Sequence, residues 1–220
     1  ATFYSYDNIN RAAKIIHVEQ EPTAIGRYFP VEIGIWGDAP TVARQLLTEA
    51  KKSSKRKEAL AWSDTLRADR RAFLAQRDAD AQIDANPIQP SGLYKTLRDV
   101  CPKESAYTMD AGTLCLQATD ALNYWQPQSL FTPLDFGLVG FSFAAGLGVK
   151  LSMPERPVIS LMGDGGFGMT TSELSTAVDY GINTVTVVMN NGCWGAEKAY
   201  QRDFFNGRYI GADISSPPFD

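Results

Sequence analysis

Two short apolar runs, each followed by a polar turn, organise the C-terminal half of the chain. They occupy residues 157–162 (PVISLM) and 184–189 (TVTVVM). Both runs are rich in β-branched residues and bounded by turn residues, which is typical of buried parallel strands. Residues 171–178 between them predict a helix. A strand, a helix and a second strand connected in this order can lie with both strands parallel and adjacent, so their carboxyl ends share one edge of the sheet.

The rest of the chain also alternates between strand and helix patterns. Further strands are expected at 14–18, 30–39 and 106–109. Helices are expected at 40–50, where a proline stands near the N-terminus, at 91–100, and as one or two amphipathic helices within 51–85. The alternation predicts an α/β fold with a parallel sheet and helices on both faces.

Oxygen-bearing side chains follow both C-terminal strands. Asp164 stands in a Gly-Asp-Gly turn after the first strand, and Asn191 ends an Asn-Asn turn after the second. Carboxylate and amide oxygens suit Mg²⁺, which fills its other positions with phosphate and water. Gly165, Gly166 and Gly168 bring backbone amides to a helix start, which favours an anion. The pattern therefore indicates a metal held between this edge and a diphosphate.

Two other interpretations of the glycine loop remain. Residues 163–168 also match the dinucleotide fingerprint G-x-G-x-x-G. That fingerprint requires an acidic residue at the end of the second strand, where this chain has Met189-Asn190-Asn191. Asp164 inside the loop would also repel a pyrophosphate that lacked a metal. The other alternative is a glycine loop that only turns a strand into a helix.

The Gly-Asp-Gly and Asn-Asn turns together resemble the two-part thiamine diphosphate motif, with Asp164 and Asn191 standing 27 positions apart (191 − 164). The chain is similar to the acetohydroxyacid synthase-like family of thiamine diphosphate enzymes, most strongly over residues 110–220. The resemblance implies that Asp164, Asn191 and the backbone carbonyl of Cys193 bind Mg²⁺, which holds the diphosphate.

The same resemblance implies contacts to the cofactor from other loops. The Asp-x-Gly loop after strand 106–109 touches the diphosphate in the family, although a plain turn with an aspartate cap is the alternative. Val139 stands where the family often has a methionine that props the aminopyrimidine, with Leu138 as a neighbour that shares this support. The cofactor-contacting residues implied are Asp110, Gly112, Thr113, Gly137, Leu138, Val139, Gly163, Asp164, Gly165, Gly166, Asn191, Cys193 and Trp194.

The segment after the motif carries the substrate expectations. Residues 194–205 (WGAEKAYQRDFF) resemble the sulfoacetaldehyde acetyltransferases, and the Gly-Arg-Tyr run at 207–209 resembles the acetohydroxyacid synthases. The implied substrate residues are Trp194, Lys198, Tyr200 and Arg202, with Glu197 as an acid/base. Trp194 as core packing, and the two cations as a solvated helix face, are the alternatives. Tyr200 and Lys198 replace the Trp and Arg of the synthases.

The resemblance implies a reaction that breaks and forms a C–C or C–S bond on sulfoacetaldehyde or a 2-oxo acid. Phosphate or a second 2-oxo acid would be the acceptor. A non-catalytic nucleotide-binding subunit that keeps the fold is the alternative from another class.

The resemblance also divides the chain. Residues 1–50 are expected to be the end of a central α/β domain, 51–87 a helical linker, and 88–220 a diphosphate-binding domain truncated at its C-terminus. The chain does not begin with Met, and we expect a fragment or part of a split enzyme that is inactive alone. A pyrimidine-binding domain of another subunit or chain would supply the activating glutamate, in a homodimer or homotetramer.

The composition of the chain further narrows the classes of function. A net charge of −4 argues against nucleic acid as a partner, and no apolar run approaches the ~20 residues that span a bilayer. Three cysteines without metal-site spacing favour free thiols and a cytoplasmic location. His17 is the single histidine and lies in an apolar strand, which argues against a Ser-His-Asp triad and for cofactor chemistry.

Overall fold

The computed structural model describes residues 9–52, 56–133 and 136–215 and divides the chain into two compact units. The units are Ala1–Phe73 and Leu74–Asp220, and their boundary falls inside helix α2 (Arg56–Ala79). The expected division at residues 50 and 87 remains a prediction. Within the described ranges, no helix has both the length and the apolar character that crossing a bilayer requires.

The first unit contains a pair of parallel strands. Strands β1 (Ile16–Glu19) and β2 (Ile33–Trp36) lie in register from one end to the other, joined through the short 3-10 helix η1 (Pro22–Ala24). Helix α1 (Ala39–Ala50) follows β2, and its first turn is capped by Asp38, which accepts a hydrogen bond from the Thr41 N–H at 2.8 Å. The proline in the first turn fits because that position needs no amide donor.

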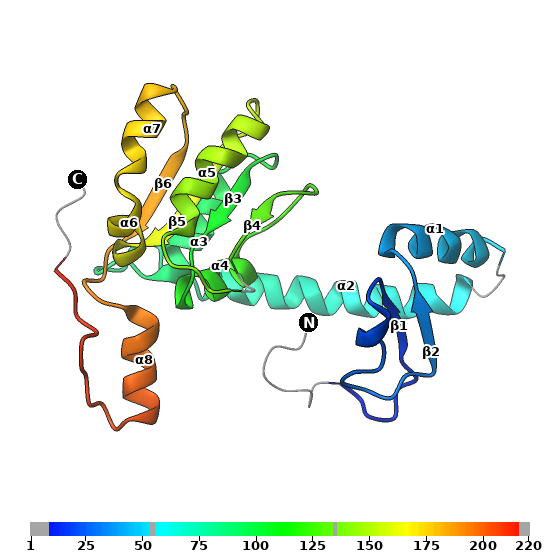
Figure 1. The fold of residues 1–220 in the computed structure, drawn as a ribbon. Coiled ribbons are helices and arrows are strands. Elements are labelled where there is room, and N and C mark those ends of the chain that lie inside the picture. The colour runs from blue at the N-terminus through cyan, green and yellow to red at the C-terminus, as the bar shows by residue number, and fades with distance from the viewer. Residues whose placement is uncertain (1–8, 53–55, 134–135, 216–220) are drawn as a thin grey trace. The chain divides into compact units, whose positions relative to one another are not determined.

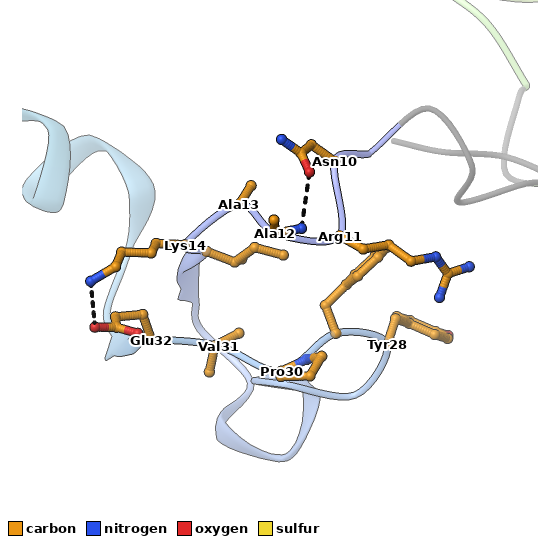
Figure 2. Close-up of a pocket in the computed structure, with 11 residues that line it drawn as sticks. Asn10, Arg11, Ala12, Ala13, Lys14, Tyr28, Pro30, Val31 and Glu32 are labelled. Atoms are coloured by element: carbon orange, nitrogen blue, oxygen red, sulfur yellow. Dashed lines mark hydrogen bonds and ion pairs between the residues drawn. The ribbon is translucent and has the colours of Figure 1, made fainter.

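An open hollow of about 490 Å³ lies in the first unit (Figure 2). It lies between residues 10–15 and 28–32. Lys14 and Glu32 pair at 3.3 Å on its rim, and the Asn10 side chain accepts a hydrogen bond from the Ala12 N–H. These polar groups satisfy one another at the surface, so they do not converge on a common point inside the hollow.

The second unit is built on a four-stranded parallel sheet with the order β4-β3-β5-β6 (Figure 1). Its strands are β3 (Ala106–Met109), β4 (Leu130–Phe131), β5 (Val158–Gly163) and β6 (Val185–Met189). Its complete helices are α3 (Pro90–Val100), α4 (Thr113–Ala121), α5 (Phe141–Ser152), α6 (Asp164–Thr170), α7 (Glu173–Asp179) and α8 (Gly195–Phe204). The predicted α/β fold with a parallel sheet is confirmed, and the two C-terminal apolar runs are adjacent strands.

Alternate residues of the central strands pack on opposite faces of this sheet. Tyr107 of β3 and Leu161 of β5 are buried in the core cluster shared with α3 and α4. The neighbouring residue Met162 points the other way and packs with Phe143 and Leu147 of α5. Because both faces of the central strands are covered, their residues are buried on both sides, which explains the nearly continuous apolar run of β5 in the sequence.

Helix α5 approaches the sheet closely through small polar side chains. The hydroxyl of Thr108 donates to the Ser142 carbonyl, and the Ser142 hydroxyl donates to the Thr108 carbonyl, both at 2.9 Å. A side chain at Gly146 would overlap the Ser160 hydroxyl, so glycine is required there. This buried network fixes the first turns of α5 on β3 and β5, and with them the loop that precedes the helix.

The segment between β5 and β6 differs from the expectation of one helix at 171–178. Helix α6 begins at Asp164 itself, and α7 starts only at Glu173. A glycine-rich segment has low intrinsic helix propensity, so the sequence pattern did not indicate a helix there. Phe167 supplies the missing stabilisation, because it is buried with its ring centroid 5.7 Å from that of Phe143.

Arg156 connects the loops at the amino ends of the strands. Its guanidinium donates to the carbonyls of Glu104 (2.7 Å) and Gln128 (3.0 Å) and to the hydroxyl of Ser129 (2.7 Å). We expect Arg156→Ala to lower the free energy of unfolding by about 2 kcal/mol, because these acceptors lose a charged donor. Urea denaturation measures the change. Arg67→Ala, which removes an exposed ion pair on α2, is the control and should stay within about 0.5 kcal/mol; equal losses would contradict this account.

Candidate functional site

A cavity of about 560 Å³ opens at the carboxyl ends of β3, β5 and β6. This is the edge where ligands of open α/β sheets bind. The loops after these strands, the loop before α5 and one side of α8 form its walls. Most residues predicted to hold a cofactor or substrate line it: Asp110, Gly112, Thr113, Gly137, Val139, Gly163, Asp164, Gly165, Gly166, Asn191, Cys193, Trp194, Glu197 and Arg202. Leu138, Lys198 and Tyr200 are not among its lining residues.

The turns after β5 and β6 are connected directly. Asp164 is 2% exposed and its carboxylate accepts a hydrogen bond from the Gly192 N–H at 3.1 Å. The side-chain oxygen of Asn191 accepts one from the Cys193 N–H at 3.1 Å. These contacts follow from the strand register, which pairs Gly163 with Met189 and so places the two turns next to each other.

Two glycines of the motif have no room for a side chain. A Cβ at Gly165 would lie 2.5–2.9 Å from carbons of the Trp194 ring, and one at Gly166 would overlap the Asp110 carboxylate. Trp194 therefore covers Gly165 from the side of α8, while Asp110 meets Gly166 from the side of β3. The glycines are needed for this close packing.

Asp110 caps helix α5 from a distance in sequence. Its carboxylate accepts hydrogen bonds from the N–H groups of Gly140 (3.0 Å) and Phe141 (2.8 Å), with a longer one from Ser142 (3.4 Å). Burial raises the pKa of the Asp110 carboxyl, and the backbone N–H donors offset part of that rise. This is not the local cap that was the alternative for the loop, because α4, the helix that follows it, has Gly112 at its N-cap and no side-chain cap; Asp110 caps α5 and also lines the cavity.

Two loops next to the cavity depend on left-handed glycines. Gly112 precedes α4 with φ of 91°, and Gly140 precedes α5 with φ of 87°. Val139, half-buried, stands in the wall of the cavity beside Gly140. Leu138 is 49% exposed and lies outside that wall. Of the two neighbours expected to share support of the cofactor, Val139 is the one that faces the cavity.

The predicted substrate residues on α8 separate into two groups. Glu197 and Arg202 line the cavity. The Arg202 guanidinium donates to the Asp203 carboxylate at 2.6 and 3.0 Å, and this pairing raises the pKa of Arg202. Lys198 instead pairs with Asp213, and that hydrogen bond raises the pKa of Lys198. Tyr200 is 61% exposed, with its ring 4.5 Å from that of Phe204.

Several lining residues had not been predicted. Gln117 faces the cavity one helical turn after Thr113 on α4, and Ala196 and Ala199 face it from α8. An interpretation of 113–121 as a helix would have found Gln117, because residues four positions apart share a helix face. The two alanines carry no chemical signal, and their contribution is the space that their small side chains leave.

Comparison with known proteins agrees with the fold and the motif. The family model described as "Thiamine pyrophosphate enzyme, C-terminal TPP binding domain" matches residues 110–220. The chain belongs to this family.

Individual relatives are full enzymes of greater length. A sulfoacetaldehyde acetyltransferase of Alcaligenes xylosoxydans xylosoxydans is 30% identical over 95% of this chain and 38% of its own length. An acetolactate synthase large subunit of Corynebacterium glutamicum is 31% identical over 90% of this chain and 31% of its own length. The chain thus spans less than two-fifths of these curated relatives.

A solved structure shows the same fold. The Rhodococcus jostii RHA1 thiamine diphosphate-dependent 4-hydroxybenzoylformate decarboxylase matches with a TM-score of 0.55 and 27% identity. The match covers 59% of this chain and 24% of the decarboxylase chain. Together with the family match, it identifies the sheet and its helices as a thiamine diphosphate-binding fold.

Thiamine diphosphate and Mg²⁺ are the cofactors typical of this family, and the cavity residues fit them. Asp164 and Asn191 offer the hard oxygen donors that Mg²⁺ prefers, and the backbone of Gly165 and Gly166 lines the same cavity, where a diphosphate would lie. The described residues contain no cluster of three His, Cys, Asp or Glu side chains that would hold a metal. The proposed ligands here are one carboxylate, one amide and one backbone carbonyl, so they do not form such a cluster. Phosphate and water would complete the coordination of the metal.

Removal of the Asp110 cap should destabilise the second unit. We expect Asp110→Ala to lower the free energy of unfolding by about 2 kcal/mol, because the N–H groups of Gly140 and Phe141 lose their buried acceptor. Chemical denaturation followed by circular dichroism measures this. Asp38→Ala, which removes the less buried cap of α1, is the matched comparison and should cost about 1 kcal/mol. A smaller loss of unfolding free energy for Asp110→Ala than for Asp38→Ala would contradict the assignment of Asp110 as the buried cap of α5.

Proposed function

We propose that this chain forms the diphosphate-binding part of a thiamine diphosphate- and Mg²⁺-dependent enzyme. The proposal rests on the contact between the turns after β5 and β6, because these turns bring Asp164 and Asn191 into the wall of one cavity. Asp164, Asn191 and the carbonyl of Cys193 bind the metal, which ties down the diphosphate. The cavity wall formed by Gly137, Val139 and Trp194 holds the rest of the cofactor.

The cofactor supplies the chemistry, and the chain supplies its binding and the recognition of substrate. Bound thiamine diphosphate provides a carbanion stabiliser that amino-acid side chains lack. Arg202 binds the anionic end of the substrate, since it is the one cation among the described residues that line the cavity. Glu197, which lines the same wall of α8, holds or transfers a proton near that end. Trp194 limits the cavity on the substrate side.

The reaction that we propose converts sulfoacetaldehyde and phosphate into acetyl phosphate and sulfite, with cleavage of the C–S bond of sulfoacetaldehyde. It is supported by the sulfoacetaldehyde acetyltransferase of Alcaligenes, 30% identical to this chain, and by the acidic and basic pattern of α8. An acetolactate synthase-type carboligation or decarboxylation of 2-oxo acids is the second candidate, supported by the 31% identity with the Corynebacterium protein. A nucleotide-binding subunit without activity is the candidate from another class.

The assembly belongs to the same proposal. A pyrimidine-binding domain of another subunit or chain closes the cofactor site, in a homodimer or homotetramer. Residues 1–50 are the end of a central domain, 51–87 a helical linker, and 88–220 the diphosphate-binding domain. The free thiols of Cys101 and Cys193 support a cytoplasmic location.

Replacement of Asp164 tests the metal site. We expect Asp164→Ala to weaken Mg²⁺-dependent binding of thiamine diphosphate roughly 100-fold or more, because loss of a ligand costs at least as much as loss of an outer partner. Isothermal titration calorimetry at several Mg²⁺ concentrations measures the affinity. Asp179→Ala at the exposed end of α7 is the control and should bind as the parent protein does. Unchanged affinity for Asp164→Ala would favour the nucleotide-binding subunit.

Turnover tests the reaction. The protein in its complete assembly, given thiamine diphosphate, Mg²⁺, sulfoacetaldehyde and phosphate, should release acetyl phosphate and sulfite in equal amounts. Arg202→Met should raise the KM for sulfoacetaldehyde about tenfold, because a charge-assisted hydrogen bond to the sulfonate is lost. If the cofactor binds but neither product forms, while pyruvate is converted, the carboligase or decarboxylase candidate is correct instead.

A further inference from the structure

The segment that follows α8 turns back along that helix and reaches the motif (Figure 1). We call residues 205–215 the return segment. Asn206 (φ 53°) and Gly207 (φ 70°) take left-handed conformations that reverse the chain. The Gly207 N–H then donates to the Gln201 carbonyl at 3.1 Å, which closes the end of the helix.

Two side chains of α8 hold the return segment along its length. Gln201 binds the backbone of Ile210 at both ends of its amide, donating to the Ile210 carbonyl at 2.9 Å and accepting from the Ile210 N–H at 2.8 Å. Lys198 pairs with Asp213, and its ammonium lies 5.6 Å from the centre of the Tyr209 ring. Side chains that bind the backbone and side chains of a loop at several points in this way fix its path.

The return segment in turn pairs with the turn that carries the predicted metal ligands. The Ile214 N–H donates to the Gly192 carbonyl at 2.9 Å, and the Trp194 N–H donates to the Ala212 carbonyl at 2.7 Å. These bonds flank an antiparallel bridge between Cys193 and Asp213.

The pairing determines the direction of the Cys193 backbone. In an antiparallel pair flanked by two hydrogen bonds, the N–H and C=O of the central residue point away from the partner strand. The Cys193 N–H accordingly donates to the side-chain oxygen of Asn191 at 3.1 Å, on the side away from the return segment. The Cys193 carbonyl is therefore directed by the return segment, and the return segment is held by Gln201 and Lys198.

We propose that Lys198 and Gln201 are positioning residues that set the metal-binding geometry of Asn191 and Cys193 by holding the return segment against their turn. The proposal rests on the proposed function, because it assigns these residues to the Mg²⁺ site of that function. It gives Lys198 a role that agrees with its position outside the cavity lining and with its ion pair to Asp213. Arg202 then acts alone on the anionic group of the substrate.

The test measures the Mg²⁺ concentration that gives half-maximal binding of thiamine diphosphate, by calorimetry on the complete protein. Lys198→Ala and Gln201→Ala should each raise this concentration about tenfold, the range seen for partners that orient metal ligands. The affinity for thiamine diphosphate at saturating Mg²⁺ should change much less. Gln201→Glu, which keeps the acceptor for the Ile210 N–H and removes the donor, is a milder second variant.

Two further variants separate positioning from other effects. The exchange Lys198→Asp with Asp213→Lys keeps an ion pair at this place and should restore Mg²⁺ binding to near the parent value. Lys95→Ala removes the Lys95–Asp99 pair on α3, away from the site, and is the matched control with no expected effect. Unfolding temperatures of all variants are measured in parallel, because a structural defect alone would lower stability and affinity at saturating Mg²⁺ together.

Each outcome decides the proposal. Unchanged half-saturation by Mg²⁺ in both Lys198→Ala and Gln201→Ala overturns it, and so does a loss in Lys198→Ala that the charge exchange does not restore. If the parent protein binds no thiamine diphosphate at any Mg²⁺ concentration, the proposed function itself fails. If the parent protein binds normally and the variants are unaffected, the inference alone fails and the proposed function stands.

Discussion

The parallel pairing of β5 with β6 is the constraint on which the site depends. Their register joins Gly163 to Met189, so the turns that follow must emerge side by side at one edge of the sheet. Asp164 and Asn191 are distant in sequence and meet only through this pairing. Packing on both faces holds the register, because a slip by one residue would move Leu161 from the core cluster of α3 and α4 to the opposite face, where Met162 packs on α5. The same strand pairing therefore determines both the stability of the core and the geometry of the site.

The remaining walls of the cavity are fixed by polar ties between segments. Asp110 connects β3 to the start of α5, and Trp194 covers Gly165 from the start of α8. The return segment does not line the cavity but is tied to α8, which does, through Gln201. Asp110 satisfies buried backbone N–H groups that would otherwise lack a partner, Trp194 holds Gly165 by packing, and Gln201 holds the return segment by two hydrogen bonds, so loops rich in glycine take defined positions.

The sequence carried enough information for the sheet and the cavity, and less for the helices around them. Continuous β-branched runs identified β5 and β6, and the turns after them identified Asp164 and Asn191. Helix α6 was missed because its glycines have poor propensity, whereas tertiary burial of Phe167 stabilises it. The cap that Asp110 provides to α5 was not predicted, since its partners lie about thirty residues away and sequence suggested only a cap of the helix that follows it. Lys198 was expected near substrate from its charge, but charge in a sequence does not show which carboxylate will pair with it.

The central claim is that one metal ion sits between the turns after β5 and β6. The most direct measurement is anomalous diffraction from crystals of the complete protein grown with thiamine diphosphate and Mn²⁺ in place of Mg²⁺. The account predicts a single strong peak within bonding distance of the Asp164 carboxylate, the Asn191 side-chain oxygen and the Cys193 carbonyl. A peak elsewhere, or bound thiamine diphosphate without a peak at these three groups, would contradict it.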